Sequence, residues 1–253
     1  MIKAIDIHKS FDGVEVLKGI TMDFCRGKTN LIIGKSGAGK TVLLKIIVGL
    51  LEPSAGEVRY DGVNFFSLNK KQKREIRMQI GMLFQGSALF DSMTVEENVG
   101  FPLNMFTKKT YAEKLRRINE VLERVNLENV NDKYPSELSG GMQKRVGIAR
   151  SIVMKPRYLF CDEPNSGLDP KTALLIDELL HEITVENNIT TVINTHDMNS
   201  VMGIGENIAY LHEGDLAWKG TKSEVLESDN ELLQSFIFAS PFLQELRRKA
   251  LGK

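Results

Sequence analysis

Apolar residues recur along this chain in two spacings, one typical of strands and one typical of helices. Apolar residues at positions 2, 4, 5 and 7 predict a first strand, and positions 14–17 and 20–24 predict two short strands after it. The fully apolar run at 31–33 predicts a buried strand, and residues 42–47 predict a helix soon after it. Further strands are expected at residues 80–84, 158–161, 190–194, 208–211 and 216–218.

Helical spacing dominates between residues 86 and 157. Thr94 and Glu97 form a Thr-x-x-Glu capping box, and apolar residues at positions 115, 118, 121, 122 and 125 share one helical face. We therefore expect one α/β domain over residues 1–253, with a mostly parallel sheet, helices on both of its faces and an antiparallel β part at the N-terminus. Its expected parts are a core at 1–85 and 158–221, a helical lobe at 86–157 and a helical extension at 222–253.

The composition is ordinary for a globular protein and narrows the choice of function only slightly. Thirty-three basic residues balance 33 acidic ones, so no net charge favours nucleic acid or an anionic membrane as a partner. The chain has two cysteines, Cys25 and Cys161, and we expect neither a disulfide framework nor a cysteine-rich metal site. The first residues lack the apolar core of a signal peptide, and no window approaches the length of a membrane span. We expect a cytoplasmic location.

Residues 34–41 match the phosphate-binding motif G-x-x-x-x-G-K-[S/T] between a predicted strand and a predicted helix. Its glycines permit a tight turn whose N–H groups bind an anion together with the helix N-terminus. Lys40 is expected to contact the β- and γ-phosphates of a nucleotide, and the Thr41 hydroxyl is expected to bind Mg²⁺. The alternative is a glycine-rich turn that ends in Lys-Thr by chance. The candidate nucleotide-binding residues of this P-loop NTPase core are Gly34, Lys35, Ser36, Gly37, Ala38, Gly39, Lys40, Thr41 and Val42.

A second candidate anion site lies at residues 139–143. Ser139 is a natural helix N-cap, and the two glycines after it leave the helix end bare. The phosphate loop already surrounds its nucleotide, so a second helix end has little left to hold within one chain. If two copies meet head to tail, each Ser139 helix can contact the γ-phosphate held by the other copy; the alternative is an ordinary capped helix. The residues of this candidate site are Ser139, Gly140, Gly141, Met142 and Gln143.

Two adjacent carboxylates, Asp162 and Glu163, follow the apolar strand that ends at Cys161. This arrangement suits a Mg²⁺ site, with Asp162 orienting the metal through water and Glu163 polarising the water that attacks the γ-phosphorus. Burial alone explains the apolar strand but does not explain two acids at its end. Cys161 is expected to pack in the core rather than to react.

Residues 138–143, Leu-Ser-Gly-Gly-Met-Gln, match the signature sequence of ABC transporters, and here the chain resembles a known family. The phosphate loop, the signature and the two carboxylates occur in the family's order, and the resemblance covers nearly the whole chain. It implies an ATPase that uses ATP and Mg²⁺, forms an ATP-sandwich homodimer with a second copy of itself, and acts on separate membrane-spanning permease subunits.

The resemblance also implies roles for single residues. His196 resembles the family's switch histidine, which contacts the γ-phosphate, although a lone histidine is often structural. Gln85 resembles the glutamine that binds Mg²⁺ and water and joins the core to the lobe; otherwise it is a polar strand end. Asp169 lies in a segment similar to the family's D-loop at the dimer seam. Phe11 corresponds to the aromatic residue that stacks on adenine, or else it is a core residue at a turn. Asn165 stands where relatives often carry Thr, Ser or Phe.

The segment 88–99, which contains Ala-Leu-Phe-Asp-Ser before Thr-Val, is similar to the subgroup that drives Mla/Mce-type lipid transport. Asp229, Phe236 and Pro241–Phe242 in the tail are loosely similar to the same subgroup. This likeness implies a phospholipid cargo and an Mce-type lipid-binding partner. The broader resemblance to ABC transporters implies that a helix of the permease binds in a groove between the core and the helical lobe, near Gln85. It also implies a peripheral position on the cytoplasmic face of the inner membrane.

Two other functions stay open at this point. One is the ATPase of an ABC importer for a small solute such as an amino acid, with the same chemistry and a different partner. The other is a non-transport ABC ATPase of DNA repair or translation, but the chain has neither the long coiled coils nor the second cassette of such proteins. We therefore expect no nucleic-acid partner. The basic residues Arg247, Arg248 and Lys249 either contact lipid head groups or, as we expect, form a solvated helix end.

Overall fold

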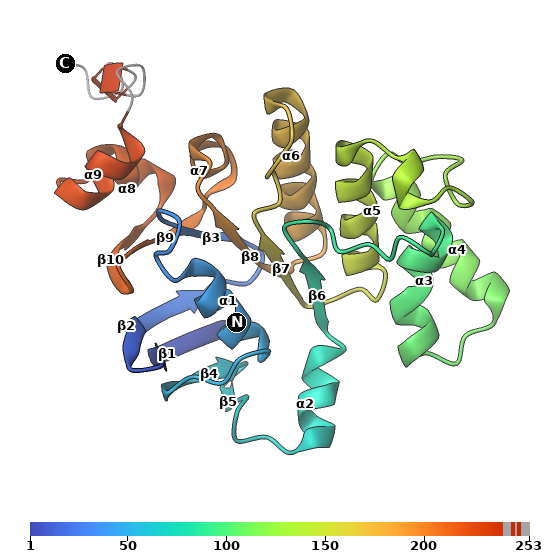
Figure 1. Cartoon of the computed structure of the whole chain (residues 1–253), viewed down its shortest axis with the longest axis horizontal. Helices are drawn as coiled ribbons and strands as arrows, with labels where there is room; N and C mark the ends of the chain where they lie inside the picture. Colours follow the sequence, from blue (N-terminus) through green and yellow to red (C-terminus); the bar gives the residue numbers. More distant parts are fainter. Residues whose placement is uncertain (240–243, 246, 249–253) are drawn as a thin grey trace.

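The computed structural model describes residues 1–239, 244–245 and 247–248, and Figure 1 shows their arrangement. Pro241, Phe242 and Lys249, which entered the expectations for the tail, lie outside the described residues. Within the described part, no helix combines the length and the apolar character needed to cross a membrane.

A six-stranded sheet forms the centre of the fold (Figure 1). Its strands lie in the order β10 (Asp215–Gly220), β9 (Asn207–His212), β3 (Thr29–Ile33), β8 (Thr190–Thr195), β7 (Tyr158–Asp162) and β6 (Ile80–Leu83). Within this sheet, all neighbouring strands are parallel except β10 with β9. Every residue of β3, β7 and β8 is buried, as is typical of parallel strands covered on both faces. The expected mostly parallel sheet is confirmed.

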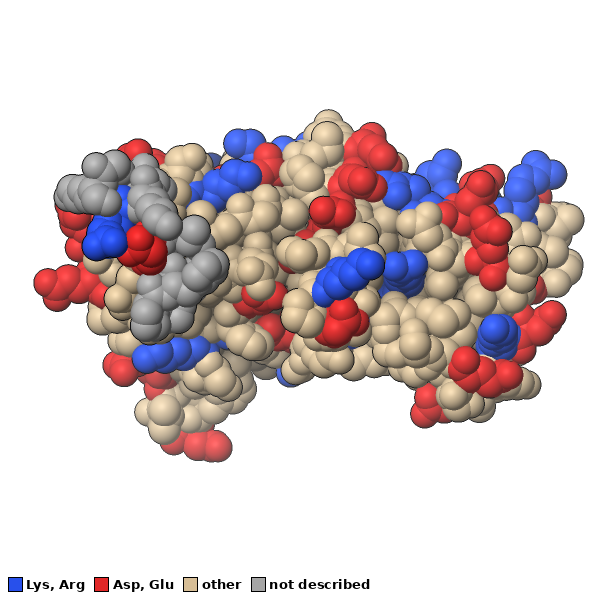
Figure 2. Space-filling view, turned by 90° about the horizontal axis from the view of Figure 1, so that it is seen from above, with Lys and Arg blue, Asp and Glu red and all other residues tan. Residues whose placement is uncertain are grey.

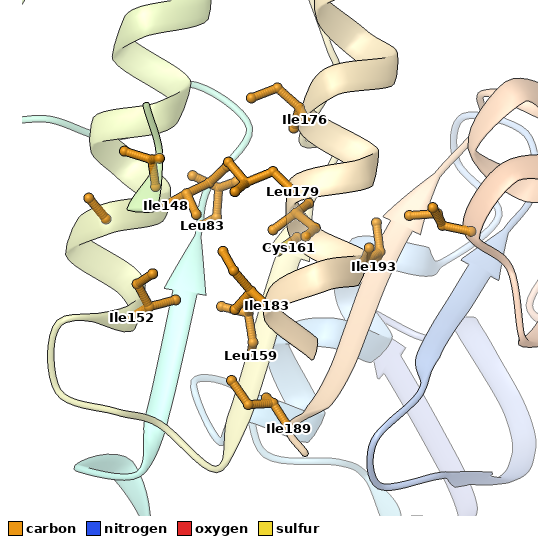
Figure 3. Close-up of a cluster of buried hydrophobic side chains, with 14 of the residues drawn as sticks. Leu83, Ile148, Ile152, Leu159, Cys161, Ile176, Leu179, Ile183, Ile189 and Ile193 are labelled. Atoms are coloured by element: carbon orange, nitrogen blue, oxygen red, sulfur yellow. The ribbon is translucent and has the colours of Figure 1, made fainter. Parts of the chain in front are cut away.

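The two faces of this sheet lie against two apolar cores, because successive side chains of a strand point to opposite faces. Leu31 and Ile33 lie in one core, and Ile32 lies in the other. The first core also holds side chains of α5 (Gly140–Ile152), α6 (Pro170–Glu186) and α7 (Met198–Ile204). Figure 3 shows the part of it in which α5 and α6 pack beside β6 and β7. Cys161 is fully buried there, and burial raises the pKa of its thiol, which agrees with a packing role.

The second core lies between α1 (Lys40–Val48) and an antiparallel sheet of the N-terminal strands. This sheet has the order β2 (Val14–Phe24), β1 (Ile2–Phe11), β4 (Ala55–Tyr60) and β5 (Val63–Asn64). The expectation of two short strands at 14–17 and 20–24 is wrong, because β2 is continuous. Gly19 has a φ of 82° and falls where the register with β1 shifts, so it forms a bulge rather than a turn.

Helices fill the chain between β6 and β7. These are α3 (Val95–Phe106), α4 (Tyr111–Arg124), a short 3-10 helix (Pro135–Glu137) and α5. The expected capping box of Thr94 and Glu97 begins α3, and α4 buries Ile118, Val121 and Leu122 as its spacing predicts. Before β6, the basic helix α2 (Lys70–Arg77) buries none of its residues.

The tail packs against the edge of the central sheet through α8 (Lys222–Glu227) and α9 (Glu231–Ile237). The ring of Phe236 stacks on that of Tyr210 in β9, with 5.0 Å between the ring centroids. The expectation of a solvated end is wrong for Arg247, whose guanidinium donates to the Leu226 carbonyl at 2.9 Å and to Gln234 Oε1 at 2.8 Å. These acceptors are provided by α8 and α9, which the sequence alone did not place beside it.

Candidate nucleotide site

The phosphate loop connects β3 to α1 at the carboxyl end of the central sheet. Gly34 has a φ of 152°, and a side chain there would collide with the carbonyl oxygen of Leu211. Gly39, with a φ of 98°, is the N-cap of α1, and no side chain accepts a hydrogen bond at this cap. A methyl group at Gly39 would lie 2.7 Å from Cδ2 of Leu17. Both glycines therefore allow a close backbone approach, and the bare N-terminus of α1 can bind an anion.

Lys40 bends back over this loop, and only 8% of its surface is exposed. Its Nζ donates to the carbonyl oxygens of Gly34 at 2.7 Å and Lys35 at 3.2 Å. It also lies 3.9 Å from Glu163 Oε1. Burial lowers the pKa of Lys40, and the carboxylates of Glu163 and Asp162 oppose that shift. The cation is thus held at the mouth of the loop, where its motif predicts phosphate binding.

Oxygen atoms of Thr41 and Asp162 meet beside the loop. Thr41 Oγ1 donates to Asp162 Oδ1 at 3.3 Å, and the same oxygen accepts a hydrogen bond from Asn194 Nδ2 at 3.0 Å. The described residues contain no group of three or more His, Cys, Asp or Glu side chains that could enclose a metal ion. Mg²⁺ suits this set nevertheless, because it is commonly held by one or two protein oxygens together with water and substrate phosphates. Thr41 and Asp162, together with the predicted ligand Gln85, would hold it.

Glu163 and His196 are in contact. Nδ1 of His196 lies 2.9 Å from Glu163 Oε2, and the histidine side chain is 66% exposed while that of Glu163 is 15% exposed. Glu163 has a φ of 49°, a left-handed conformation that is uncommon outside glycine and costs free energy. Its N–H donates to the Asn194 carbonyl at 3.0 Å. The fold therefore fixes the direction of the Glu163 side chain, which points toward His196 and Lys40.

Gln85 follows β6 and extends toward the loop after β7 that begins with Glu163, which we call the carboxylate loop. There, Gln85 Nε2 donates to Ser166 Oγ at 3.3 Å. Two cations of α5 hold the backbone around it. Lys144 Nζ donates to the Gln85 carbonyl, and Arg150 donates to the carbonyls of residues 87–88. Burial lowers the pKa of Lys144. The helix that starts at the signature sequence is thus hydrogen-bonded to the predicted Mg²⁺ ligand loop.

Lys40, Thr41, Gln85, Glu163 and His196 line one pocket of about 680 Å³, a size suited to a nucleotide-sized ligand. Phe11 does not line this pocket; its ring is 42% exposed and Lys9 Nζ lies 5.1 Å from the ring centroid. An adenine contact by Phe11 stays a prediction.

Sequence reasoning missed Val16, Phe236 and Asn194, because only the fold brings β2, α9 and β8 to this place. The lining residues are Val16, Lys35, Ser36, Gly37, Gly39, Lys40, Thr41, Val42, Gln85, Glu163, His196 and Phe236.

The signature helix does not belong to this pocket. Ser139 is the N-cap of α5, with Oγ accepting a hydrogen bond from the Met142 N–H at 3.3 Å, and the residue is exposed. Asp169 caps α6 by accepting a hydrogen bond from the Thr172 N–H at 3.0 Å. Hydrogen bonds with the Thr172 side chain and with this N–H lower the pKa of Asp169. Ser139 and Asp169 therefore cap helices outside the pocket that Lys40 lines.

Charge is mixed on the face shown in Figure 2, which views the molecule from above. Lys and Arg side chains lie among Asp and Glu side chains over the part that is not grey. The part of this face that is not grey therefore carries no broad basic surface that would attract an anion.

The family follows from a direct comparison. A family model described as an ABC transporter matches residues 17–166, more than half of the chain. The chain belongs to the ABC transporter family. It is the ATP-binding subunit of an ABC transporter, and it is an ATPase that uses ATP with Mg²⁺. The match includes the phosphate loop, the signature and both carboxylates.

Three curated relatives agree on the family and differ in name. The chain is 36% identical over 236 residues to the "Probable ribonucleotide transport ATP-binding protein mkl" of Mycobacterium leprae, spanning 93% of this chain and 68% of the relative. It is 39% identical over 245 residues to the "Methionine import ATP-binding protein MetN" of Thermobifida fusca, spanning 95% and 76%. It is 34% identical over 256 residues to the chloroplastic "Protein TRIGALACTOSYLDIACYLGLYCEROL 3" of Arabidopsis thaliana, spanning 95% and 74%. The shared sequence therefore does not identify a cargo.

Two solved structures confirm the ABC ATPase fold. One is a dimeric post-hydrolysis state of the ATP-binding cassette MJ0796 with ADP and Pi; it is 33% identical, with a TM-score of 0.81 over 88% of this chain and 99% of that chain. The other is cbiO1 of Clostridium perfringens, described as part of the ABC transporter complex cbiONQ. It is also 33% identical, with a TM-score of 0.83 over 97% of each chain.

Proposed function

We propose that this ABC ATPase powers phospholipid transport through separate membrane-spanning subunits. The observation that carries the ATPase part is that Lys40, Thr41, Glu163 and His196 line one pocket, with Asp162 hydrogen-bonded to Thr41 beside it. The lipid part is supported by the segment 88–99 and by the similarity to the Arabidopsis protein that bears the name of a glycolipid. The proposed location is peripheral, at the cytoplasmic face of the inner membrane.

The geometry suggests how hydrolysis proceeds. Lys40 Nζ exchanges its loop carbonyls for oxygens of the β- and γ-phosphates. Glu163 turns from His196 and takes a proton from the water whose oxygen bonds to the γ-phosphorus, while the bond from that phosphorus to the bridging oxygen breaks to give ADP and phosphate. His196 then donates to the γ-phosphate. Mg²⁺, when bound, neutralises charge on the phosphate oxygens.

We further propose that a second copy completes each site. The pocket of one chain lacks Ser139, although the capped N-terminus of α5 is exposed and suited to an anion. In a head-to-tail dimer, the Ser139 helix of each copy contacts the γ-phosphate bound by the other. The related cassette MJ0796 is dimeric in its solved structure.

An apolar groove of about 710 Å³ lies between the core and the helical lobe, next to the Gln85 loop. Its exposed side chains include Phe84, Phe90 and Met105, with 40%, 41% and 57% of their surfaces exposed. Exposed apolar grooves of this kind commonly receive an amphipathic helix of a partner. We propose that a helix of the permease subunit binds here. A movement of that permease helix would be transmitted to Gln85 through the backbone of residues 85–88, to which Lys144 and Arg150 donate hydrogen bonds.

Met105→Asp tests the groove as the permease contact. Because an aspartate must be desolvated in an apolar groove, we expect co-purification of the membrane subunit to fall about tenfold. ATPase activity of the isolated chain should change by less than about twofold, since Met105 lies outside the nucleotide pocket. Val63→Asp is the matched control, because Val63 is 49% exposed on β5, away from the groove. Equal recovery of the membrane subunit by both variants would exclude the groove.

The main alternative is an ABC importer ATPase for an amino acid or similar solute, and the similarity to MetN favours it. Purification of the tagged chain from detergent-solubilised membranes distinguishes the two. Recovery of a spanning subunit together with an Mce-type lipid-binding protein supports the lipid function. Recovery of a spanning subunit whose complex binds a small solute supports the importer, and recovery of ribosomes or DNA would contradict both.

A further inference from the structure

A largely buried polar cluster lies where the carboxylate loop packs against α6 and α7. Asn165 belongs to the loop after β7, Asp177 to α6 and Ser200 to α7. Asn165 Nδ2 donates to Asp177 Oδ1 at 2.8 Å, and Ser200 Oγ donates to Asp177 Oδ2 at 2.7 Å. Asn165 Nδ2 also lies 3.1 Å from Ser200 Oγ. Asp177 is 3% exposed and Ser200 is 1% exposed, so one buried carboxylate joins two other segments.

The burial of the Asp177 carboxylate is energetically unfavourable. Burial raises the pKa of Asp177 to about 6, although the hydrogen bonds from Ser200 and Asn165 work against that rise. The like charges of Asp197, before α7, and Glu178, on α6, raise the pKa further. Within the described residues, an amide and a hydroxyl hold the carboxylate, and no cation pairs with it. An apolar side chain would pack here without that penalty, which argues for a role beyond packing.

The cluster joins the two segments that carry Glu163 and His196. Glu163 precedes Asn165 by two residues, and His196 precedes Ser200 by four. The strands before them, β7 and β8, are parallel neighbours. On the pocket side the two segments meet through the exposed contact of Glu163 with His196. On the buried side they meet through Asn165 and Ser200, both bonded to Asp177.

We propose that Asn165, Asp177 and Ser200 form a positioning network that fixes the Glu163 segment relative to the His196 segment. This inference rests on the proposed catalytic roles of Glu163 and His196. When Glu163 turns toward water, the pocket-side contact between the segments is lost, and the buried bonds keep both in place. In this network the amide N–H groups of Asn165 find their acceptor in Asp177, while Asn165 Oδ1 has no hydrogen-bond partner in the part of the chain that the structure describes.

Exchanging the donor and the acceptor tests this network with nearly unchanged side-chain volumes. Asn165→Asp places a second carboxylate against Asp177, whereas the double variant N165D/D177N restores an amide–carboxylate pair in the opposite direction. We expect Asn165→Asp to lower kcat about tenfold or more with KM for ATP within about twofold, because a partly buried charge-assisted bond is lost outside the binding pocket. The double variant should recover kcat to within about threefold of the unchanged protein. Phosphate release over a range of ATP concentrations gives both constants, and a thermal melt gives Tm.

Asn129→Asp is the matched control, since Asn129 is exposed in the loop after α4, and it should leave kcat unchanged. Recovery of kcat in the double variant supports the network. A double variant no more active than Asn165→Asp, or a loss expressed in KM, would overturn it. If Asn165→Asp does not fold, a folded double variant that is active supports the network, and one that is inactive overturns it. Glu163→Gln in the same assay separates the two levels: an active Glu163→Gln refutes the catalytic role, whereas an inactive one with a fully active Asn165→Asp refutes the network alone.

Discussion

Glu163→Gln is expected to keep ATP binding while lowering turnover by about 100-fold or more, the scale of a lost general base. The amide has the shape of the carboxylate and can still bind His196, but it cannot accept a proton from the attacking water. The variant is therefore expected to accumulate as an ATP-bound dimer, because hydrolysis is what opens the proposed sandwich. Phosphate release measures turnover, equilibrium binding of labelled ATP measures affinity, and light scattering during size-exclusion chromatography measures the dimer.

The structure offers a strict control for this experiment. Glu128 lies exposed in the loop after α4, so Glu128→Gln makes the same chemical change away from the pocket and should leave turnover unchanged. Hydrolysis by Glu163→Gln at the rate of the unchanged protein would show that Glu163 is not the base. Loss of ATP binding along with turnover would instead point to a structural role, since Glu163 Oε1 also lies 3.9 Å from Lys40 Nζ.

The parts of this protein that local sequence determines could be predicted. The phosphate loop needs only eight consecutive residues and the strand and helix beside them. The caps of α3 and α5, by Thr94 and Ser139, depend on groups within one helical turn. The predictions of the family, the mostly parallel sheet and the use of ATP with Mg²⁺, which rest on such local signals, are confirmed.

The parts that tertiary contacts determine could not be predicted. Residues 14–17 and 20–24 read as two separate strands, and only the pairing with β1 shows that Gly19 is a bulge in one continuous strand. Asn194 donates to Asp162 because β7 and β8 pair in one particular register. Phe236 reaches the pocket from the tail because α9 packs against β9. No spacing in the sequence carries that information, and so these residues appear only in the folded chain.

Lys40→Ala is expected to weaken ATP binding by about 30-fold or more, the effect of removing one partner of a desolvated charge pair. Lys40 is the buried cation of the loop, and its Nζ is bonded to the loop carbonyls that precede it. Because burial already lowers its pKa, removing the ammonium should cost little folding stability, and Tm should change by only a few degrees, about the shift produced by 1 kcal/mol. Equilibrium binding of labelled ATP, with and without added Mg²⁺, measures the effect.

Lys45→Ala is the appropriate comparison, because Lys45 lies on the same helix with its side chain exposed. It removes an equal charge from the last turn of the same helix, so a general effect of the charge of α1 appears in both variants, and only the contact of Lys40 with phosphate appears in one. Weak binding by Lys40→Ala and ordinary binding by Lys45→Ala would place the β- and γ-phosphates at Lys40. Ordinary binding by both would overturn the assignment of residues 34–41 as the phosphate loop. The roles proposed for Glu163 and His196 would then need a different substrate, since both residues line the same pocket as that loop and Glu163 lies 3.9 Å from Lys40.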